Sequence, residues 1–505
     1  MRNWRSWLAP VVGGLVLGYI LLQVWPVQIM SYDKIPKVGE TFDEYAFAWA
    51  GASMWNHGVP VAWTTNLGVY KSVASENSSM KGSELDGLQL THAGTRINLK
   101  NPDSGSLPII SVQTVDYGLG DRYVALVEPY FDHPPLTGLI YGATISQDNE
   151  SLIGIEAEEY RYANRFIYLA CGILVAVLAY QISGAWAGVF AGGVYLTMPS
   201  VMLSQRLTLA ENILALWLVA MLLAMFGAKN SKHWGWLLSA GIVSGLAILT
   251  KMSGVAVLIG AVWLLYRWSF PWRQWLWVVV PAVFLGGMFV IYGTWLSSDL
   301  FWEVMVSQAG RGNWGIINVY QSMGRLFFLG FPMDGWWVGG LVVLMYGGWR
   351  SKSMRRIVEV GLIYLSLMLM LGGGNYAWYF FPLGAMWAIG YGYLMKEILF
   401  NPKVVGILLF IIFGLMSSFY WGEMQLNPGT DYSWIIRGLF VILTGGWVVY
   451  EWVVKRWPSL PWRYGWIAVW CLIYYRTMVW SLRGMTFILA NWEQLPMPLM
   501  WGIGG

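Results

Sequence analysis

The chain has 505 residues, of which 57% are apolar and only 11% are charged. Soluble domains are about 45–50% apolar and about 25% charged, so most of this chain has too little charge for a water-facing surface. The composition predicts a polytopic membrane protein, and the net charge of +4 is too small to indicate a nucleic-acid partner. Its two cysteines, Cys171 and Cys471, lie far apart in apolar runs, which excludes a disulfide framework and a thiolate metal site.

Apolar runs that approach the length of a bilayer span, about 20 residues, recur along the chain. The first, residues 9–27, ends without a small-residue cleavage site, so it is predicted to be a retained helix rather than a signal peptide. The other twelve predicted spans are 166–182, 186–199, 213–226, 234–249, 255–265, 275–295, 336–346, 357–371, 378–394, 404–419, 435–453 and 466–480. Trp and Tyr edge many of these runs, as expected at the headgroup level.

Lysine and arginine in short loops indicate the cytoplasmic side of each span. With a cytoplasmic N-terminus, thirteen spans put every cation cluster between spans on the inner side. These inner clusters are Arg2 and Arg5, Lys229 and Lys232, Arg267 and Arg273, residues 350–356, Lys396 and Lys403, and residues 455–463. The C-terminus is then predicted to lie outside, and one span more or fewer would misplace the later clusters.

A long outer loop, residues 31–161, holds 17 of the 27 acidic residues. Its middle, residues 64–129, alternates short strand-like runs (88–90, 95–99, 109–112) with turn clusters, which predicts a small β-rich insertion. The predicted organisation is therefore a first transmembrane helix (1–30), this loop, a transmembrane bundle (162–484) and an outer tail (485–505).

Two polar motifs lie in the loop, where charge near the membrane indicates function. Asp43 and Glu44 begin a predicted short interfacial helix, 44–55, although an acidic pair there also fits simple N-terminal stabilisation by the helix dipole. Asp132 and His133 precede Pro-Pro-Leu, whose prolines favour an extended segment followed by a helix start. A lone histidine is more often an ordinary surface residue.

A third group lies at predicted outer ends of spans and comprises Gln205, Arg206, Glu211, Asn212, Lys251, Arg311, Asn375, Tyr376, Trp378 and Tyr379. The inside bias of cations should remove Arg206, Lys251 and Arg311 from this side. Each alone is explained equally well by snorkelling towards headgroups. Together, on the same side as Asp43, they indicate an anion such as phosphate.

At these residues the sequence resembles a known family. The Asp-Glu pair after the first span, the His-Pro-Pro-Leu element that closes the loop and the late Trp-Tyr-Phe-Phe-Pro stretch (378–382) are similar to those of GT-C glycosyltransferases. The most similar group is the protein O-mannosyltransferase-like branch, which includes the lipid A aminoarabinose transferase. The resemblance implies an all-α GT-C fold and inverting transfer of a sugar from a polyprenyl-phosphate carrier to an acceptor hydroxyl outside the cytoplasm.

The resemblance also implies residue roles. Asp43 would be the general base that takes the acceptor's proton, and Glu44 would help to orient acceptor or sugar. The other assignments are donor-phosphate binding by Lys251, Arg206, Arg311 and Tyr379, and acceptor or sugar binding by Asp132, His133, Glu211 and Tyr376. The family often has a lysine before Pro-Pro, and its loop is usually shorter than residues 31–161.

The expected partners are a polyprenyl-phosphate sugar, the lipid bilayer and a lipid, glycan or protein acceptor. Low His and Cys content argues against zinc, whereas carboxylates can hold Mg²⁺ or Mn²⁺, so use of a metal stays open. The expected location is a bacterial plasma membrane, or the endoplasmic reticulum in a eukaryote, with the site facing away from the cytoplasm. Three alternatives are a transporter or flippase of lipid-linked saccharides, an O-antigen ligase or polymerase, and a saccharide-binding scaffold without catalysis.

Overall fold

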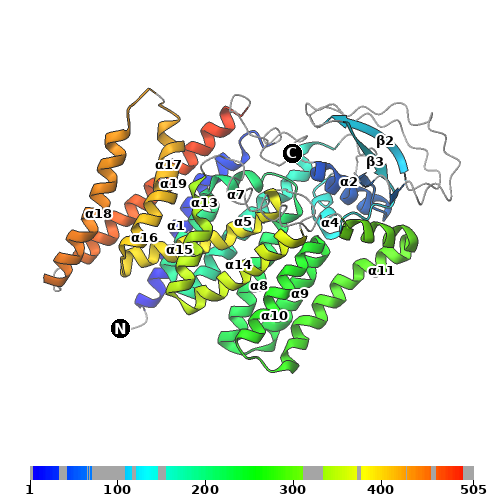
Figure 1. Cartoon of the computed structure of the whole chain (residues 1–505), viewed down its shortest axis with the longest axis horizontal. Helices are drawn as coiled ribbons and strands as arrows, with labels where there is room; N and C mark the ends of the chain where they lie inside the picture. Colours follow the sequence, from blue (N-terminus) through cyan, green and yellow to red (C-terminus); the bar gives the residue numbers. More distant parts are fainter. Residues whose placement is uncertain are drawn as a thin grey trace.

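The computed structural model describes residues 4–32, 42–64, 66, 69–70, 109–116, 121–145, 155–310, 334–371, 377–427, 429–456 and 462–492. It is a helical bundle with one small sheet at its edge (Figure 1). Every predicted span falls on a helix of this bundle. Five helical segments are long and apolar enough to cross a membrane, and the chain is a multi-pass membrane protein; the full count of thirteen spans stays a prediction.

The helices of the first half of the bundle are α1 (Trp4–Ile29), α5 (Ala157–Ser183), α6 (Ala185–Thr197), α7 (Pro199–Ser204), α8 (Ala210–Ser231), α9 (Trp234–Thr250), η4 (Met252–Gly254), α10 (Val255–Arg267) and α11 (Trp272–Gly310). Those of the second half are α13 (Gly335–Arg350), α14 (Lys352–Leu371), η5 (Ala377–Phe380), α15 (Pro382–Phe400), α16 (Val404–Leu409), η6 (Phe410–Leu415), α17 (Met416–Phe419), η7 (Tyr420–Met424), α18 (Ser433–Arg456) and α19 (Trp462–Ala490). The five long apolar segments are α5, α8, α11, the run from α16 to η7, and α18.

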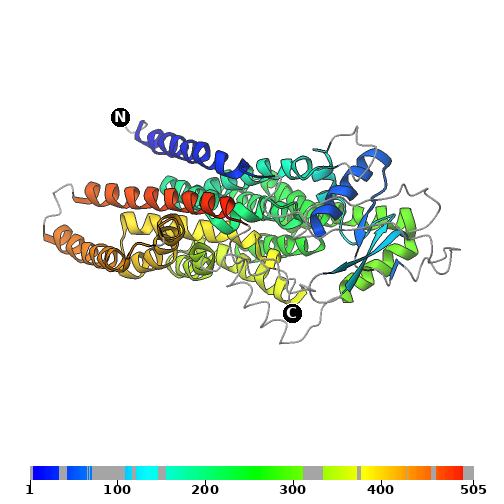
Figure 2. The same ribbon diagram turned by 90° about the horizontal axis from the view of Figure 1, so that it is seen from above.

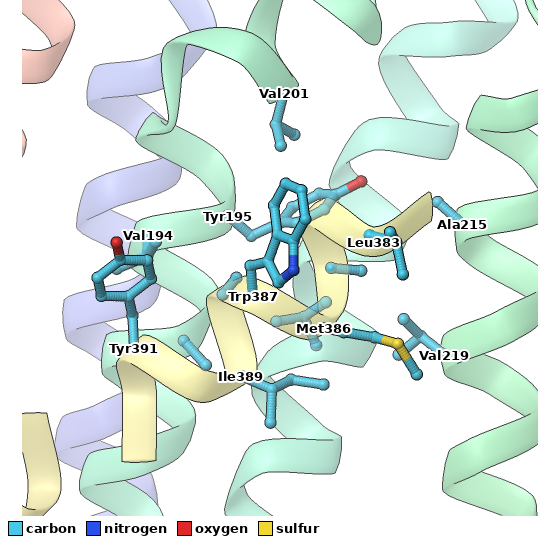
Figure 3. Packing of buried hydrophobic residues seen from close by; sticks show 14 of the residues in the cluster. Val194, Tyr195, Val201, Ala215, Val219, Leu383, Met386, Trp387, Ile389 and Tyr391 are labelled. Atoms are coloured by element: carbon cyan, nitrogen blue, oxygen red, sulfur yellow. The ribbon is translucent and has the colours of Figure 1, made fainter. Parts of the chain in front are cut away.

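Helix α15 forms the centre of the bundle, where it packs against α6, α7 and α8 (Figure 3). Its Trp387 is 1% exposed and meets the Trp337 ring of α13 edge to face at 4.1 Å. Gly340 permits this contact, since a β-carbon there would lie 2.4 Å from the Trp387 ring. This packing fixes α15, and with it the η5 turn that precedes it.

A smaller assembly caps one end of the bundle (Figure 2). It contains α2 (Phe42–His57), α4 (Leu136–Gly142) and an antiparallel sheet of β1 (Ala62–Thr64), β2 (Ile109–Asp116) and β3 (Asp121–Val127) in the order β1-β3-β2. The predicted interfacial helix corresponds to α2, and the predicted strand 109–112 falls within β2. The predicted strands 88–90 and 95–99 lie outside the described residues.

Most helices extend beyond their predicted spans, and the extensions of α11 and α19 affect the architecture. Helix α11 continues past Ser297, whose φ of −162° and ψ of 95° break the helix, and its last part packs with Phe301 against Phe131 and Phe289. Helix α19 runs to Ala490, into the segment predicted as an outer tail, because Met485 and Ile488 are fully buried. The extension of α11 brings a helix over α2 and the sheet.

Candidate active site

Lys251 lies where α9 ends, at the capped end of the bundle. Its Nζ is 2.5 Å from Oε1 of Glu211 in the first turn of α8 and 4.4 Å from the centre of the Tyr379 ring in η5. Both charged side chains are buried, with 9% of Lys251 and 1% of Glu211 exposed. Three residues predicted for the site, far apart in sequence, are thus brought into contact.

A break between two helices presents this lysine. Lys251 is extended, with φ −157° and ψ 145°, and the chain turns at once into η4, where the Gly254 N–H donates to the Lys251 carbonyl at 2.7 Å. A β-carbon at Gly254 would lie 2.0 Å from the Ala247 carbonyl oxygen, so only glycine permits this reversal without a shift of the backbone. The tight turn therefore holds the lysine in the site.

Asp43 stands in the first turn of α2, where a carboxylate is favoured by the helix dipole. Its side chain is partly exposed, and its charge acts on both Lys251 and Glu211. Burial by itself lowers the pKa of the Lys251 ammonium, but Glu211, Tyr379 and Asp43 together raise that pKa above its usual value. The candidate site therefore combines one buried cation with two carboxylates.

Glu44 does not lie where its predicted role requires. Its carboxylate accepts two hydrogen bonds from Arg161, at 3.0 Å from Nε and 2.7 Å from Nη2, and a third from the Thr208 amide at 2.8 Å. Both Glu44 and Arg161 are fully buried. We therefore correct the expectation that Glu44 orients acceptor or sugar: it ties the start of α2 to α5 and to the loop before α8.

Arg206 also has a different position from the one expected. It is fully buried, its guanidinium donates to the carbonyls of Gln28 at 2.9 Å and Met30 at 2.5 Å, and it stacks on the Tyr32 ring at 5.0 Å. These carbonyls belong to the C-terminal end of α1, which has no further helical N–H groups to satisfy them. Arg206 thus caps α1 through these two donors, both of which face protein carbonyls.

The His-Pro-Pro-Leu element joins α2 to the lysine. Pro135 precedes α4, and the Thr137 hydroxyl donates to the Thr250 carbonyl at 2.7 Å, next to Lys251. Helix α4 touches α2 backbone to backbone, since a β-carbon at Gly51 would lie 1.9 Å from the Gly138 carbonyl oxygen. The spacing between Asp43 and Lys251 therefore depends on α4.

Asp132 and His133 separate in the structure. Asp132 is buried and accepts hydrogen bonds from the hydroxyls of Thr64 in β1 and of Tyr70. These bonds hold β1 and the segment at residues 69–70 in place, which differs from the expected role of Asp132 in binding acceptor or sugar. His133 is partly exposed and packs 5.0 Å from the Phe47 ring. It lines a hollow together with Phe47, Ala50, Met54, Tyr130, Phe289 and Tyr292.

This hollow continues the face of α2 that begins with Asp43. Residues 43, 47, 50 and 54 follow the spacing of one helix face, and the last three line the hollow. Tyr292 of α11 covers it and donates to the Gly58 carbonyl at 3.1 Å. An aromatic cavity with one histidine therefore lies one turn beyond the candidate base.

Several residues of the site were not predicted. Arg161, Thr208, Thr137 and Gly51 are single polar or small residues without a local motif, and only the tertiary contacts reveal them. Arg311 and Tyr376, predicted for phosphate and for acceptor or sugar, lie outside the described residues. Within the described part of the chain, no group of three or more His, Cys, Asp or Glu residues could hold a metal ion.

Comparisons with known proteins agree with the family expected from the sequence. The model of the dolichyl-phosphate-mannose-protein mannosyltransferase family matches residues 132–297, from Asp132 to the kink of α11, and thus includes Glu211 and Lys251. No curated protein matches the chain.

Solved structures are remotely similar to the chain. ArnT from Cupriavidus metallidurans bound to undecaprenyl phosphate shares 16% identity over 72% of this chain and 69% of its own, with a TM-score of 0.44. The same protein in the apo state shares 18% identity over 72% and 68%, with a TM-score of 0.41. The Archaeoglobus fulgidus oligosaccharyltransferase in the apo form shares 11% identity over 95% of this chain and 57% of its own, with a TM-score of 0.46. The family match, which covers about a third of the chain, supports the resemblance to GT-C glycosyltransferases drawn from the sequence.

Proposed function

We propose that the chain is an inverting glycosyltransferase that moves a sugar from a polyprenyl-phosphate donor to an acceptor hydroxyl, with Asp43 as the general base. The observation that supports this most is the buried Lys251 ammonium, paired with Glu211, set against the Tyr379 ring and within the field of Asp43. The reaction needs a cation for the leaving phosphate and an accessible carboxylate for the acceptor's proton, and Lys251 and the partly exposed Asp43 could supply them.

The reaction has two electrostatic requirements. The acceptor hydroxyl transfers its proton to the Asp43 carboxylate while its oxygen forms a bond to the anomeric carbon from one face. On the other face the bond from that carbon to the phosphate oxygen breaks, and the electron pair leaves with the lipid phosphate. Lys251 stabilises the charge that develops on this leaving group, which is worth most in a water-poor site. A positioned base typically contributes about 10²–10⁴-fold in rate.

The hollow lined by Phe47 and His133 is our candidate for the acceptor subsite. It lies on the same face of α2 as Asp43, so a group held there presents a hydroxyl to the carboxylate. Glu211 and Tyr376 keep their expected roles with acceptor or sugar as proposals, and Arg311 keeps its expected role with phosphate. The acceptor class (lipid, glycan or protein) and the sugar are proposals that a substrate panel must resolve.

Two further points belong to this proposal. The site would face away from the cytoplasm in the bacterial inner membrane, with the N-terminus inside, because the predicted outer ends of α5, α8 and α9 all meet α2 or α4. If a divalent cation, Mg²⁺ or Mn²⁺, is used, the carboxylates of Asp43 and Glu211 would be its candidate ligands. Turnover measured in a chelator and after adding back each metal tests that point.

The decisive experiment measures transfer by the purified protein in lipid nanodiscs, with a panel of undecaprenyl-phosphate sugars and release of undecaprenyl phosphate as the readout. Asp43→Asn should lose about 10²–10⁴-fold in turnover while its unfolding temperature stays unchanged. Asp431→Asn is the matched control, because Asp431 also stands at a helix start but is exposed, and it precedes α18, which lies at the opposite side of the molecule from α2 (Figure 1).

Lys251→Ala should bind undecaprenyl phosphate at least tenfold more weakly. Normal turnover by Asp43→Asn would overturn the assignment of the base. Movement of intact donor across the membrane without release of undecaprenyl phosphate would favour the flippase alternative.

A further inference from the structure

Two buried carboxylates near the site hold their cations in different ways. Glu44 uses both oxygens, with three hydrogen bonds from Arg161 and Thr208. Glu211 uses one, Oε1, which accepts from Lys251 at 2.5 Å. Its other oxygen, Oε2, is buried and finds no hydrogen-bond partner among the described residues. Glu44 is therefore fixed, whereas Lys251 is the one side chain among the described residues that donates a hydrogen bond to Glu211, and one acceptor of Glu211 is left unsatisfied.

We propose that Glu211 is a built-in competitor for the lipid phosphate: it occupies Lys251 in the empty site, and the phosphate binds by displacing it. The inference rests on the proposed function, since it assumes that Lys251 holds the phosphate. Glu211 is then a positioning residue that keeps the affinity for the spent carrier low enough for release.

The surroundings of Lys251 explain why the two anions compete. An ammonium has three N–H donors, and one face of this one is covered by the Tyr379 ring while Glu211 lies in direct contact. The side chain is only 9% exposed, so little of the ammonium is left for a further ligand. A phosphate oxygen at hydrogen-bond distance must therefore share or take the position of Oε1.

Electrostatic repulsion also indicates that Glu211 and the phosphate compete. Asp43 and Glu211 already act together on one lysine, and a phosphate adds a third anion to the same buried cluster. Like charges in a partly buried site repel strongly. The Glu211 charge therefore weakens phosphate binding in two ways, by holding the cation and by repelling the ligand; removing the charge ends the repulsion and weakens the hold on the cation.

Glu211→Gln is the appropriate change, because the amide keeps the size of the side chain and an oxygen for Lys251 while removing the charge. We expect this variant to bind undecaprenyl phosphate about tenfold more tightly than the unmodified protein, which corresponds to about 1.4 kcal/mol. Inhibition of transfer by added undecaprenyl phosphate should strengthen by a similar factor. Glu397→Gln is the matched control: Glu397 is also a buried carboxylate paired with a cation, Arg350 at 3.3 Å, but it lies at the opposite end of α15 from η5.

The outcomes separate this inference from the proposed function. Tighter binding in Glu211→Gln, with weaker binding in Lys251→Ala, supports both. Equal or weaker binding in Glu211→Gln, with weaker binding in Lys251→Ala, overturns the competition and leaves Glu211 as a support for Lys251. Unchanged binding in Lys251→Ala overturns the phosphate site itself. If Glu211→Gln does not fold, Glu211→Asp serves instead, because the shorter side chain draws the charge away from Lys251 and should also tighten binding.

Discussion

Alanine in place of Gly51 tests whether the contact between α2 and α4 positions the candidate base. The added methyl would lie 1.9 Å from the Gly138 carbonyl oxygen and 2.8 Å from the Gly142 nitrogen, all backbone atoms that no rotamer change can move. Restoring ordinary contact, at 3.4 Å or more, requires the helices to separate by about 1.5 Å at this point. Asp43 lies on the same rigid helix, about 12 Å away at 1.5 Å per residue.

The magnitudes distinguish an effect on position from an effect on stability. Overpacking typically costs about 1–3 kcal/mol, and the gain from replacing a helical glycine by alanine, about 0.5–1 kcal/mol, offsets part of it. The net loss of about 0–2.5 kcal/mol leaves most molecules folded. A misplacement of about 1 Å at a reacting group can cost about 10²-fold in rate. Gly51→Ala should therefore reduce transfer far more than it reduces the unfolding temperature.

The assay compares transfer in nanodiscs with thermal unfolding followed by tryptophan fluorescence. Gly287→Ala in α11 is the control, because a β-carbon there meets no atom within 4 Å. It should leave transfer unchanged and raise stability slightly. If Gly51→Ala transfers sugar as fast as the unmodified protein, or if both variants lose activity equally, the contact between α2 and α4 does not set the position of Asp43.

Three further predictions test the roles that the structure indicates for Glu44, Arg206 and Thr137. Glu44→Gln breaks the fully buried ion pair with Arg161 and should lower the free energy of unfolding by about 3–5 kcal/mol. Glu158→Gln, at a carboxylate that is 63% exposed, should lower it by less than about 1 kcal/mol. Unfolding in denaturant compares the two variants. Arg206→Met removes the cap of α1 and should lower the unfolding temperature without changing the affinity of the folded protein for undecaprenyl phosphate; a matching loss of affinity would return Arg206 to the phosphate site. Thr137→Val loses one hydrogen bond, about 0.5–1.5 kcal/mol, and should raise the KM for donor more than it lowers stability, because Thr250 precedes Lys251; an unchanged KM would contradict the link through α4.

The sequence predicts the helices of the bundle well because long apolar runs have few alternatives in a membrane. It also singles out Lys251 and Glu211, since charge on the cation-poor side of a membrane protein is costly unless it has a partner, and the structure brings both into contact with Tyr379 or with each other. What the sequence cannot provide is the choice of partner. Arg161, 117 residues after Glu44, looks like any arginine near a span, and its role depends on a contact that exists only after folding.

The adjacent carboxylates Asp43 and Glu44 illustrate why the motif is a pair. Consecutive residues on a helix point about 100° apart, so the two side chains cannot face the same ligand. One of them, Glu44, faces inward to Arg161 and the Thr208 amide and fixes the first turn of α2 against the bundle. Because that turn is fixed, the carboxylate of Asp43 stays within the field of Lys251 without being buried itself. As the proposed base, Asp43 would thus keep access to a substrate, while its neighbour would supply the rigidity that a precise proton transfer requires.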